Sequence, residues 1–477
     1  MKPSKLKSRE LPEERLATTD EKGKRVYLYP DDIKQGHYRN LRVKLRAFLV
    51  IFFLFLPWIK IQGHQAVLLD IPHRRFAILG LTFWAHDAPI FLFVLGILAF
   101  GIFLVTALLG RIWCGWACPQ TVFIDGVFRR IERWIEGDSV ERRKLDDGPW
   151  NENKVFKKIL KWFLFLLVSL VITHSFLAYF VGTDELLVMI RRPPLENITS
   201  FLVMAASTAV ILFDFGWFRE QFCVIVCPYG RFQSVLMDDD SWAVMYDEKR
   251  GEPRRGRVPE GKSEGDCVNC YRCVQVCPTG IDIRRGLQLE CIACTACIDA
   301  CDEVMDRLGK EQGLIRYDTL TQMAGKKVQW LRARTVIYAL IFFGIVAGFI
   351  YVLSQRQMVT ATILRAKETP YQQTEVNGQP YVINHFRINF TNESFHPLIY
   401  QVQLPPSWKE KGVELVMPLN PVQLPEGKDV KADFFVKFPK SLLQSGHGKM
   451  EITLLPGENP DRLKTETKEL PLVGPFL

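Results

Sequence analysis

Five almost purely apolar stretches run through the chain, at about 47–61, 88–110, 162–181, 200–218 and 335–353. Each has, or nearly has, the roughly 20 residues that a membrane-spanning helix needs. The first stretch is the weakest, because Pro57 interrupts it and Lys60 follows it at once. About 40 mostly polar residues precede it, which a secretory signal peptide would not have. The pattern predicts five transmembrane helices, with the first one uncleaved.

A second pattern begins at about residue 370. Apolar and polar residues alternate there in short runs, at Tyr381–Phe390, Leu398–Leu404, Val413–Met417, Ala432–Phe438 and Met450–Leu455. Turn signals such as Asn377-Gly378 and Pro456-Gly457 separate them. Alternation bounded by turns is typical of strands. About 110 residues of short strands predict an immunoglobulin-like β-sandwich.

Charge orients the predicted helices. Lys and Arg are frequent just before the first stretch and throughout the loop 111–161, whereas the two opposite loops are much poorer in them. Positive residues stay on the cytoplasmic side of a membrane. The N-terminus, the loop 111–161 and the region 219–334 are therefore expected in the cytoplasm, and everything after about residue 354 outside it. The net charge of +9 then reflects topology and contact with membrane lipids rather than nucleic-acid binding.

These patterns predict a multi-domain membrane protein. The expected parts are a cytoplasmic N-terminal segment (1–46), a four-helix transmembrane region (47–218) with its cytoplasmic loop (111–161), a cytoplasmic region (219–334) that contains a ferredoxin domain (about 258–306), a fifth transmembrane helix (335–354) and a periplasmic immunoglobulin-like domain (355–477).

Eight of the twelve cysteines form two matched quartets. These are Cys267, Cys270, Cys273 and Cys277, followed by Pro278, and Cys291, Cys294, Cys297 and Cys301. Both have the C-x2-C-x2-C-x3-C spacing of bacterial two-cluster ferredoxins, in which the fourth cysteine of each run ligates the other cluster. One [4Fe–4S] cluster is therefore expected on Cys267, Cys270, Cys273 and Cys301, and the other on Cys291, Cys294, Cys297 and Cys277. Asp302 stands where the second run would often have Pro, but Pro binds no iron.

Zinc ligation and disulfide bonding fit the quartets less well. Zinc sites use two C-x2-C pairs rather than a third cysteine at the same spacing and a fourth after three residues. Disulfides are disfavoured in the cytoplasm, where thiols stay reduced.

The remaining cysteines form two C-x3-C-P pairs, Cys114 with Cys118 and Cys223 with Cys227. Each begins a few residues beyond the cytoplasmic end of a predicted span. On a helix, thiols at i and i+4 share one face. Pro119 and Pro228 suit the first position of a new helix. Cys118 and Cys227 would then cap these helices, whose positive ends would lower the thiol pKa.

Several interpretations of the pairs remain open. A buried cysteine can be no more than a small hydrophobic residue, but two copies at equivalent depth favour a function. The four thiols, which would be the catalytic residues, could converge on copper, because thiolates prefer Cu(I). A third cluster or a dithiol redox relay would use the same residues.

Taken in order, these features resemble the cytochrome c oxidase accessory proteins of the FixG/CcoG type, which are membrane polyferredoxins. The matching pieces are YLYPDD, WCGWACPQTVF, FCVIVCPYGRFQ, and CIACTACIDACDEVMDR running on to GLIRY. The resemblance covers nearly the whole chain and implies a bacterial inner-membrane protein that assists assembly of a haem–copper oxidase. It also implies reduction of Cu(II) to Cu(I), with the eight ferredoxin cysteines carrying electrons and the paired cysteines as candidates for the copper step.

The resemblance further implies partners, namely haem–copper oxidase assembly factors or copper chaperones and a cytoplasmic electron donor that the sequence does not identify. Two other functions fit the residues. One is a quinol-linked electron-transfer subunit, and the other is an assembly scaffold whose clusters are structural.

Overall fold

The computed structural model describes residues 18, 22, 25–61, 64–71, 75–78, 81–84, 88–261, 263–355, 359–366, 369–376, 378–392, 394, 397–457 and 465–475. The chain forms two compact units. The first combines residues 1–59 with 91–349, and the second combines residues 60–90 with 350–477.

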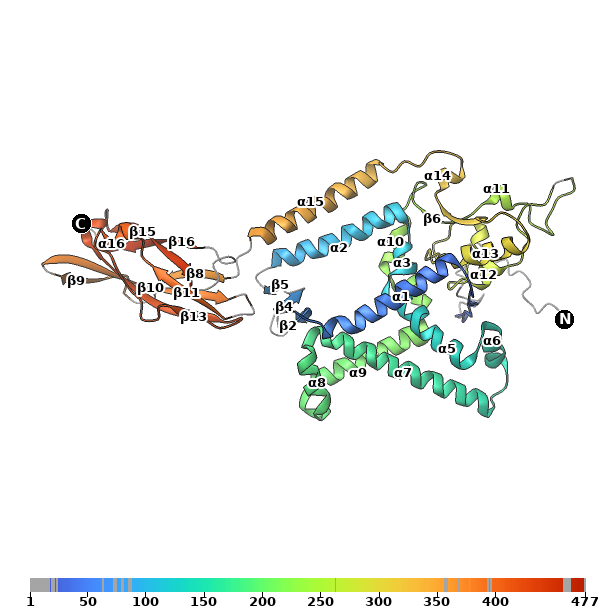
Figure 1. Ribbon diagram of the computed structural model, residues 1–477, viewed down its shortest axis with the longest axis horizontal. Coiled ribbons are helices and arrows are strands. Elements are labelled where there is room, and N and C mark those ends of the chain that lie inside the picture. The colour runs from blue at the N-terminus through green and yellow to red at the C-terminus, as the bar shows by residue number, and fades with distance from the viewer. Residues whose placement is uncertain are drawn as a thin grey trace. The chain divides into compact units, whose positions relative to one another are not determined.

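Four helices are long and apolar enough to cross a membrane among the described residues, and they make this a multi-pass membrane protein. They are α2 (Ala88–Leu109), α7 (Glu152–Val181), α9 (Ile198–Phe213, prolonged by turns on both sides) and α15 (Ala333–Gln355). Their apolar side chains are largely exposed in the protein. Lipid is as apolar as these side chains, so nothing drives them inward. Figure 1 shows α7 and α9 in the same helical layer, where they pack on each other.

The expected first span differs. Helix α1 runs from His37 to Phe55, begins ten residues earlier than expected and is not among the four helices. Its first half is basic, and Arg42 and Arg46 are buried. Pro57 ends the helix, because a proline opposes continued helical hydrogen bonding, and a short 3-10 turn (η1, Leu56–Trp58) follows. The apolar part of α1, from Phe48 to Phe55, is only about 12 Å long at 1.5 Å per residue.

Short helices connect α2 to α7 and α9 to the cysteine-rich region. The first set is α3 (Ile112–Trp116), α4 (Pro119–Phe123), the π-helical turn η3 (Ile124–Phe128), α5 (Arg129–Glu136) and α6 (Ser139–Asp147). After α7 come α8 (Thr183–Arg191) and η4 (Pro194–Asn197), and after α9 come η5 (Asp214–Phe218), η6 (Phe222–Val226) and α10 (Pro228–Leu236). Pro119 and Pro228 occupy the first turns of α4 and α10, as expected from their fixed φ.

A two-stranded antiparallel ribbon brackets the cysteine quartets. Strand β6 (Ala243–Tyr246) pairs with β7 (Ile315–Asp318), which lies after the second quartet. Between them lie α11 (Glu248–Gly251), α12 (Arg272–Gln275), η7 (Ile283–Arg285) and α13 (Ala296–Arg307), and α14 (Leu320–Met323) follows β7. Val244, Ile283, Ile298 and Met305 pack with cysteines of both quartets in one small core. The quartets therefore belong to one folded module.

The second unit contains the expected β-sandwich. One sheet has the order β12-β14-β10-β8, with β9 also paired to β10, and the other has the order β13-β11-β15-β16. The strands are β8 (Val359–Arg365), β9 (Gln372–Val376), β10 (Gln379–Asn392), β11 (Leu398–Gln403), β12 (Glu414–Val416), β13 (Val422–Leu424), β14 (Asp429–Pro439), β15 (His447–Pro456) and β16 (Glu466–Val473). Their inward side chains, including Phe386, Phe390, Phe434 and Phe438, form one core. The five expected strands correspond to β10, β11, β12, β14 and β15.

The segment between α1 and α2 also contains strands, which the hydrophobic pattern did not indicate. Strand β1 (Lys60–Ile61) pairs with β2 (His64–Gln65), and β3 (Val67–Asp70), β4 (Arg75–Ile78) and β5 (Leu81–Trp84) form an antiparallel meander. These runs are too short for a periodicity to stand out in the sequence.

Candidate iron–sulfur and thiol sites

The two quartets repeat one backbone conformation. Asn269 and Tyr271 flank Cys270 with φ of 56° and 60°, and Ala293 and Thr295 flank Cys294 with φ of 51° and 62°. A left-handed conformation costs a non-glycine residue roughly 1–2 kcal/mol. The chain adopts it at matched positions because such turns curl the loop and direct successive N–H groups toward its centre, which suits an anionic group.

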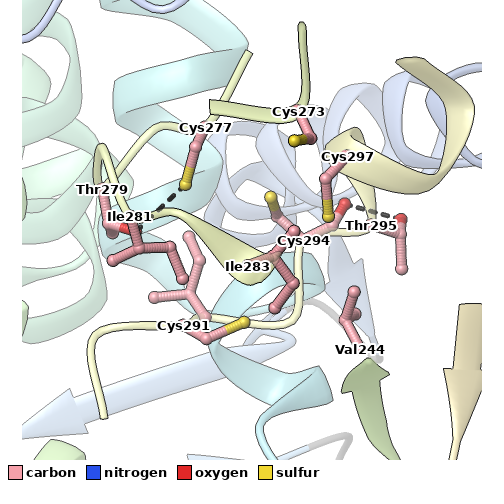
Figure 2. A pocket seen from close by; sticks show the side chains of 11 residues that line it. Val244, Cys273, Cys277, Thr279, Ile281, Ile283, Cys291, Cys294, Thr295 and Cys297 are labelled. Atoms are coloured by element: carbon pink, nitrogen blue, oxygen red, sulfur yellow. Dashed lines mark hydrogen bonds between the residues drawn. The ribbon is translucent and has the colours of Figure 1, made fainter. Parts of the chain in front are cut away.

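Five sulfurs line one cavity inside the module. Its empty volume is about 350 Å³, and its wall includes the cysteines Cys273, Cys277, Cys291, Cys294 and Cys297. Figure 2 shows the side chain of Cys277 reaching this space from the first quartet, opposite three cysteines of the second. The Cys277 thiol contacts the Thr279 hydroxyl at 3.4 Å. We call Cys277, Cys291, Cys294 and Cys297 the proximal set.

The other four cysteines form a second group. Burial and Asp302 are the largest causes of the raised pKa of Cys301, and the charges of Cys270 and Cys267 add to them. Burial likewise raises the pKa of Cys273, with a smaller contribution from Cys301. We call Cys267, Cys270, Cys273 and Cys301 the distal set. Cys270 is the exposed member. The structure thus brings the fourth cysteine of each run to the first three of the other, which is the crossed arrangement expected from the spacing.

Burial makes both sets poor places for free thiolates. Burial, helped by neighbouring sulfurs, raises the pKa of Cys291 to about 12, and burial and Asp302 raise that of Cys301 to about 12. Burial first, then the charge of Cys294, raises the pKa of Cys297 far above its ordinary value. Thiolates become favourable here only when a cation balances them. Eight thiols grouped four by four, around a cavity and in matched loops, fit two cubane clusters.

The two cysteine pairs also come together. Cys118 and Cys227 are the N-caps of α4 and α10, as predicted. Each pair straddles a break between helices, because Cys114 lies in α3 and Cys223 in η6. Burial, followed by the charges of Cys118, Cys114 and Cys227, raises the pKa of Cys223 to about 12. We call Cys114, Cys118, Cys223 and Cys227 the four-thiol site.

The predicted lowering of the Cys118 pKa is wrong. Burial is the largest influence and raises it, and the N–H groups of Gln120 and Thr121 offset only part of the increase. Burial likewise raises the pKa of Cys114, although Gln233 donates a hydrogen bond to its sulfur at 3.1 Å. The short helix α4 supplies donors, but the loss of water around the sulfur costs more.

The four-thiol site touches the proximal set directly. A Cβ on Gly115 would lie 2.5 Å from the carbonyl oxygen of Ile292 and 2.8 Å from the backbone nitrogen and Cα of Cys294. Trp116 donates its indole N–H to the carbonyl oxygen of Ala293 at 3.2 Å. Cys114 packs against the small core that holds Cys294. The turn between Cys114 and Cys118 therefore lies on the backbone of the Cys291–Cys294 loop.

Sequence reasoning missed three polar residues beside the four thiols. Arg111 is buried and bonds the Gly230 carbonyl at 3.4 Å, Gln233 is buried beside Cys114, and Tyr229 shares a 2.5 Å hydrogen bond with Thr106. All three stand inside or next to the C-x3-C-P strings. What could have indicated them in the sequence is their position, since each is a polar residue within a few positions of a paired cysteine.

A buried ionic cluster joins the loop 111–161 to the rest of the first unit. Glu132 accepts hydrogen bonds from Arg219 at 2.6 and 3.0 Å and from Arg142 at 3.1 Å. Tyr27, in the YLYPDD string, donates to the same carboxylate at 2.8 Å, and Asp31 pairs with Arg272 at 2.6 Å. The N-terminal segment therefore ties the ferredoxin module to this loop. The hydrophobic pattern gave no indication of a charged interior.

Within the described part of the chain, no three His, Cys, Asp or Glu side chains are close enough to hold a single metal ion. A cubane spreads its four ligands around a larger body, so this finding does not count against the proximal and distal sets. The four thiols of the four-thiol site, by contrast, do not form a ready-made site for a single ion in this structure.

Sequence models of known families match three parts of the chain. A 4Fe–4S dicluster domain matches residues 218–320, and a 4Fe–4S binding domain matches residues 91–137, which include the first cysteine pair. The "IG-like fold at C-terminal of FixG", whose description also names an oxidoreductase, matches residues 349–475.

Relatives cover most of the chain. Protein RdxA of Cereibacter sphaeroides is 39% identical over 71% of this chain and 74% of its own length. The chain belongs to the FixG/RdxA family. Protein RdxB of the same organism is 35% identical over 80% of this chain and 82% of its own length. Nitrogen fixation protein FixG of Rhizobium meliloti is 41% identical over 61% of this chain, an alignment that spans 57% of FixG.

One solved structure is similar in part. A FixG-related protein from Vibrio parahaemolyticus covers 25% of this chain and 97% of its own, with 14% identity and a TM-score of 0.19. The family assignment stands on the sequence relatives, and it makes this chain an iron–sulfur electron-transport protein of the membrane.

Proposed function

We propose that this FixG/RdxA-family protein reduces Cu(II) to Cu(I) for delivery to a haem–copper oxidase under assembly. The observation that carries the proposal is the backbone contact between Gly115 and the Cys291–Cys294 loop. No side chain fits between the four-thiol site and the proximal set at this point. Electrons on the proximal set therefore have a group of soft ligands directly beside them.

The two crossed sets are proposed to hold two [4Fe–4S] clusters, which supply one-electron carriers when bound. The chain's own residues define the direction of transfer. Cys270 of the distal set is exposed and offers the point of entry for a one-electron carrier protein of the cytoplasm. The proximal set lies between this entry and the four thiols. Each Cu(II) that accepts one electron from this route becomes one Cu(I), and the electron-transfer step itself moves no proton.

Copper is the substrate of this reaction, and the four thiols are its proposed site. Thiolates select Cu(I) over harder ions. Because burial raises the pKa of Cys114, Cys118 and Cys223, copper has to displace their protons as it binds. No three potential ligands already surround one point in the described residues, so pairs of thiols close around the ion as it arrives.

The proposed location is the bacterial inner membrane, with the N-terminus and ferredoxin module in the cytoplasm and the C-terminal domain in the periplasm. Helix α1 supports five crossings. Its start bonds the ferredoxin module, where Asp299 accepts from the Tyr38 N–H at 3.1 Å. Near its other end, the Phe53 carbonyl accepts from Tyr179 at 2.7 Å, close to the end of α7. Helix α1 thus runs alongside α7, and the ion pair with Asp125 neutralises Arg46 within its basic half.

Partners follow from this role. The electron donor docks on the cytoplasmic module, membrane lipids surround the exposed helices, and oxidase assembly factors or copper chaperones receive Cu(I). No nucleic acid is involved, because the basic residues serve topology and buried ion pairs.

A quinol-linked electron-transfer subunit is the second candidate. It is favoured by the match of a 4Fe–4S binding domain to residues 91–137 and by the absence, among described residues, of a preformed site for one ion. In that case the paired thiols hold a further electron carrier.

The test uses purified full-length protein with both clusters reduced under argon. One sample receives Cu(II) and another a water-soluble quinone analogue, while absorbance and EPR follow cluster oxidation and a colorimetric chelator counts Cu(I). We expect one Cu(I) for each electron lost. Cys114→Ala and Cys223→Ala should keep their iron and lose this reaction.

Cu(II) added to oxidised protein measures copper reduction by thiols alone and is subtracted. Oxidation by the quinone but not by Cu(II) would establish the second candidate. Unchanged copper reduction in Ala variants of all four thiols would rule out the four-thiol site.

A further inference from the structure

Arg111 is a buried cation between the two segments that carry the cysteine pairs, α3–α4 and η6–α10, which we call the two arms. It is only 7% exposed. It directly precedes α3, and its Nη2 reaches the Gly230 carbonyl of α10 at 3.4 Å. A Cβ on Gly230 would lie 3.4 Å from this nitrogen, so the two arms meet closely here. Arg111 therefore lies at the start of the first arm and contacts the second arm.

The guanidinium is only partly satisfied. Its Nε and Nη1 are buried without a hydrogen-bond partner, and no carboxylate of the described chain forms an ion pair with it. Three other buried arginines of this unit do have carboxylate partners, since Arg129 pairs with Asp125, and Arg142 and Arg219 pair with Glu132. A buried charge without a counter-charge is strongly disfavoured. The charge that balances Arg111 must come from something other than a carboxylate.

Three cysteine thiols interact with Arg111 instead. It hydrogen-bonds the Cys114 side chain and acts electrostatically on Cys114 and Cys223 of the four-thiol site and on Cys291 of the proximal set. Cys291 belongs to the loop that carries the Gly115 contact and lines the cavity in Figure 2. As ligands of a bound metal, these sulfurs would be thiolates and would carry negative charge. The thiolate ligands of a bound metal would therefore supply the counter-charge and the hydrogen-bond acceptors that the Nε and Nη1 groups of Arg111 lack.

We propose that Arg111 is a positioning residue, the shared counter-cation of the four-thiol site and the proximal set. A fixed positive charge favours the more negative, reduced state of a neighbouring redox centre. Arg111 raises the reduction potential of the proximal cluster relative to the distal one and so draws electrons toward the four thiols. This inference rests on the proposed function only in requiring a cluster on the proximal set.

The test is an EPR-monitored redox titration of the full-length protein with its clusters bound. Iron analysis first establishes that two clusters are present, which tests the proposed function separately. In Arg111→Gln, one of the two reduction steps should shift to lower potential by a factor of about ten in its equilibrium, about 59 mV for one electron. The other step should stay in place. Arg111→Lys keeps the charge and should keep most of the wild-type potential.

Arg332→Gln is the matched control, because Arg332 is a partly buried arginine of the same unit that pairs with Asp238 and donates to the Ala107 carbonyl. Neither step should move in it. If Arg111→Gln does not retain iron, Gln233→Lys adds a cation beside the Cys114 sulfur and should raise the same single step. Unmoved steps in Arg111→Gln, equal movement of both steps, or a shift in Arg111→Lys as large as in Arg111→Gln would each overturn the proposal.

Discussion

Arg219 and Glu132 form a fully buried pair close to the membrane helices. Each side chain is 1% exposed, and two hydrogen bonds of 2.6 and 3.0 Å join them. Such a pair contributes little by forming, but losing one partner leaves the other charge buried and alone. The cost of a substitution here therefore lies in the partner that remains.

We expect Arg219→Met to lower the free energy of unfolding by about 3–5 kcal/mol. Arg307→Met, in the exposed pair with Glu303, should cost less than about 1 kcal/mol. Chemical unfolding in detergent, followed by tryptophan fluorescence, measures both. Equal losses would mean that the Glu132 cluster is not a buried network.

Acid should unfold this part of the chain. Burial alone would raise the pKa of Glu132, but Arg219, Lys161 and Arg142 outweigh it and bring the pKa to about 2, from an ordinary 4.5. A carboxylate with a lowered folded pKa contributes stability that is complete above its unfolded pKa and is lost as the pH falls toward its folded pKa. Thermal stability should therefore decrease between pH 4.5 and 2.

Glu132→Gln should flatten this decrease without abolishing it, because Asp125 titrates in the same window. Burial raises the pKa of Asp125, while Arg46 and Arg129 outweigh it and hold the pKa at about 2. Thermal scans at several pH values measure the slope. An identical slope in wild type and variant would contradict the assigned role of Glu132.

Among the elements, the turn between α3 and α4 is where the four-thiol site touches the proximal set. Gly115→Ala places a methyl group 2.5–2.8 Å from backbone atoms of Ile292 and Cys294, which cannot move aside as a flexible side chain would. Oxidation of the reduced clusters by Cu(II) should slow by more than about tenfold, since small displacements at a reacting site have effects of this size. Iron content should stay unchanged.

Gly126→Ala is the control for this variant. Gly126 follows the same cysteine pair along the chain, and a Cβ there meets only the Arg46 Cβ of α1 at 3.7 Å, an ordinary contact. Stopped-flow absorbance compares the two variants with wild type. Wild-type rates in Gly115→Ala would show that electrons do not pass through this contact.

Among whole domains, the C-terminal sandwich has a core of its own. Every buried residue of that core lies between Val359 and Leu472. The isolated segment 359–475 should therefore unfold in one cooperative transition, as most small single domains do. Circular dichroism with heating measures this, and a gradual loss of signal would show that the domain needs the rest of the chain.

The number of crossings decides where this domain lies. If α1 is the first of five crossings, as proposed, the C-terminus should lie in the periplasm. Alkaline phosphatase fused after Leu477 should be active, and green fluorescent protein fused there should be dark. The same reporters inserted after Gly261, a position with open space around it, should give the opposite result. A bright C-terminal fusion would mean that α1 does not cross.

Much of the architecture was readable from local patterns. Long apolar runs gave α2, α7, α9 and α15, and alternation gave the longer strands of the sandwich, because each of these signals repeats many times within one element. The basic half of α1 could not be read this way. Arg46 is tolerated there only because Asp125, 79 residues away, neutralises it.

By itself, the sequence determined the chemistry of the sites. Ligand type and spacing are local properties, so two iron–sulfur quartets and two thiol pairs follow from the order of residues alone. Only the tertiary structure decided which sulfurs share a site and that Gly115 lies on the Cys294 loop. It also decided that burial, rather than a helix end, controls the Cys118 pKa. Proximity and burial depend on residues far apart in the chain, and no local pattern records them.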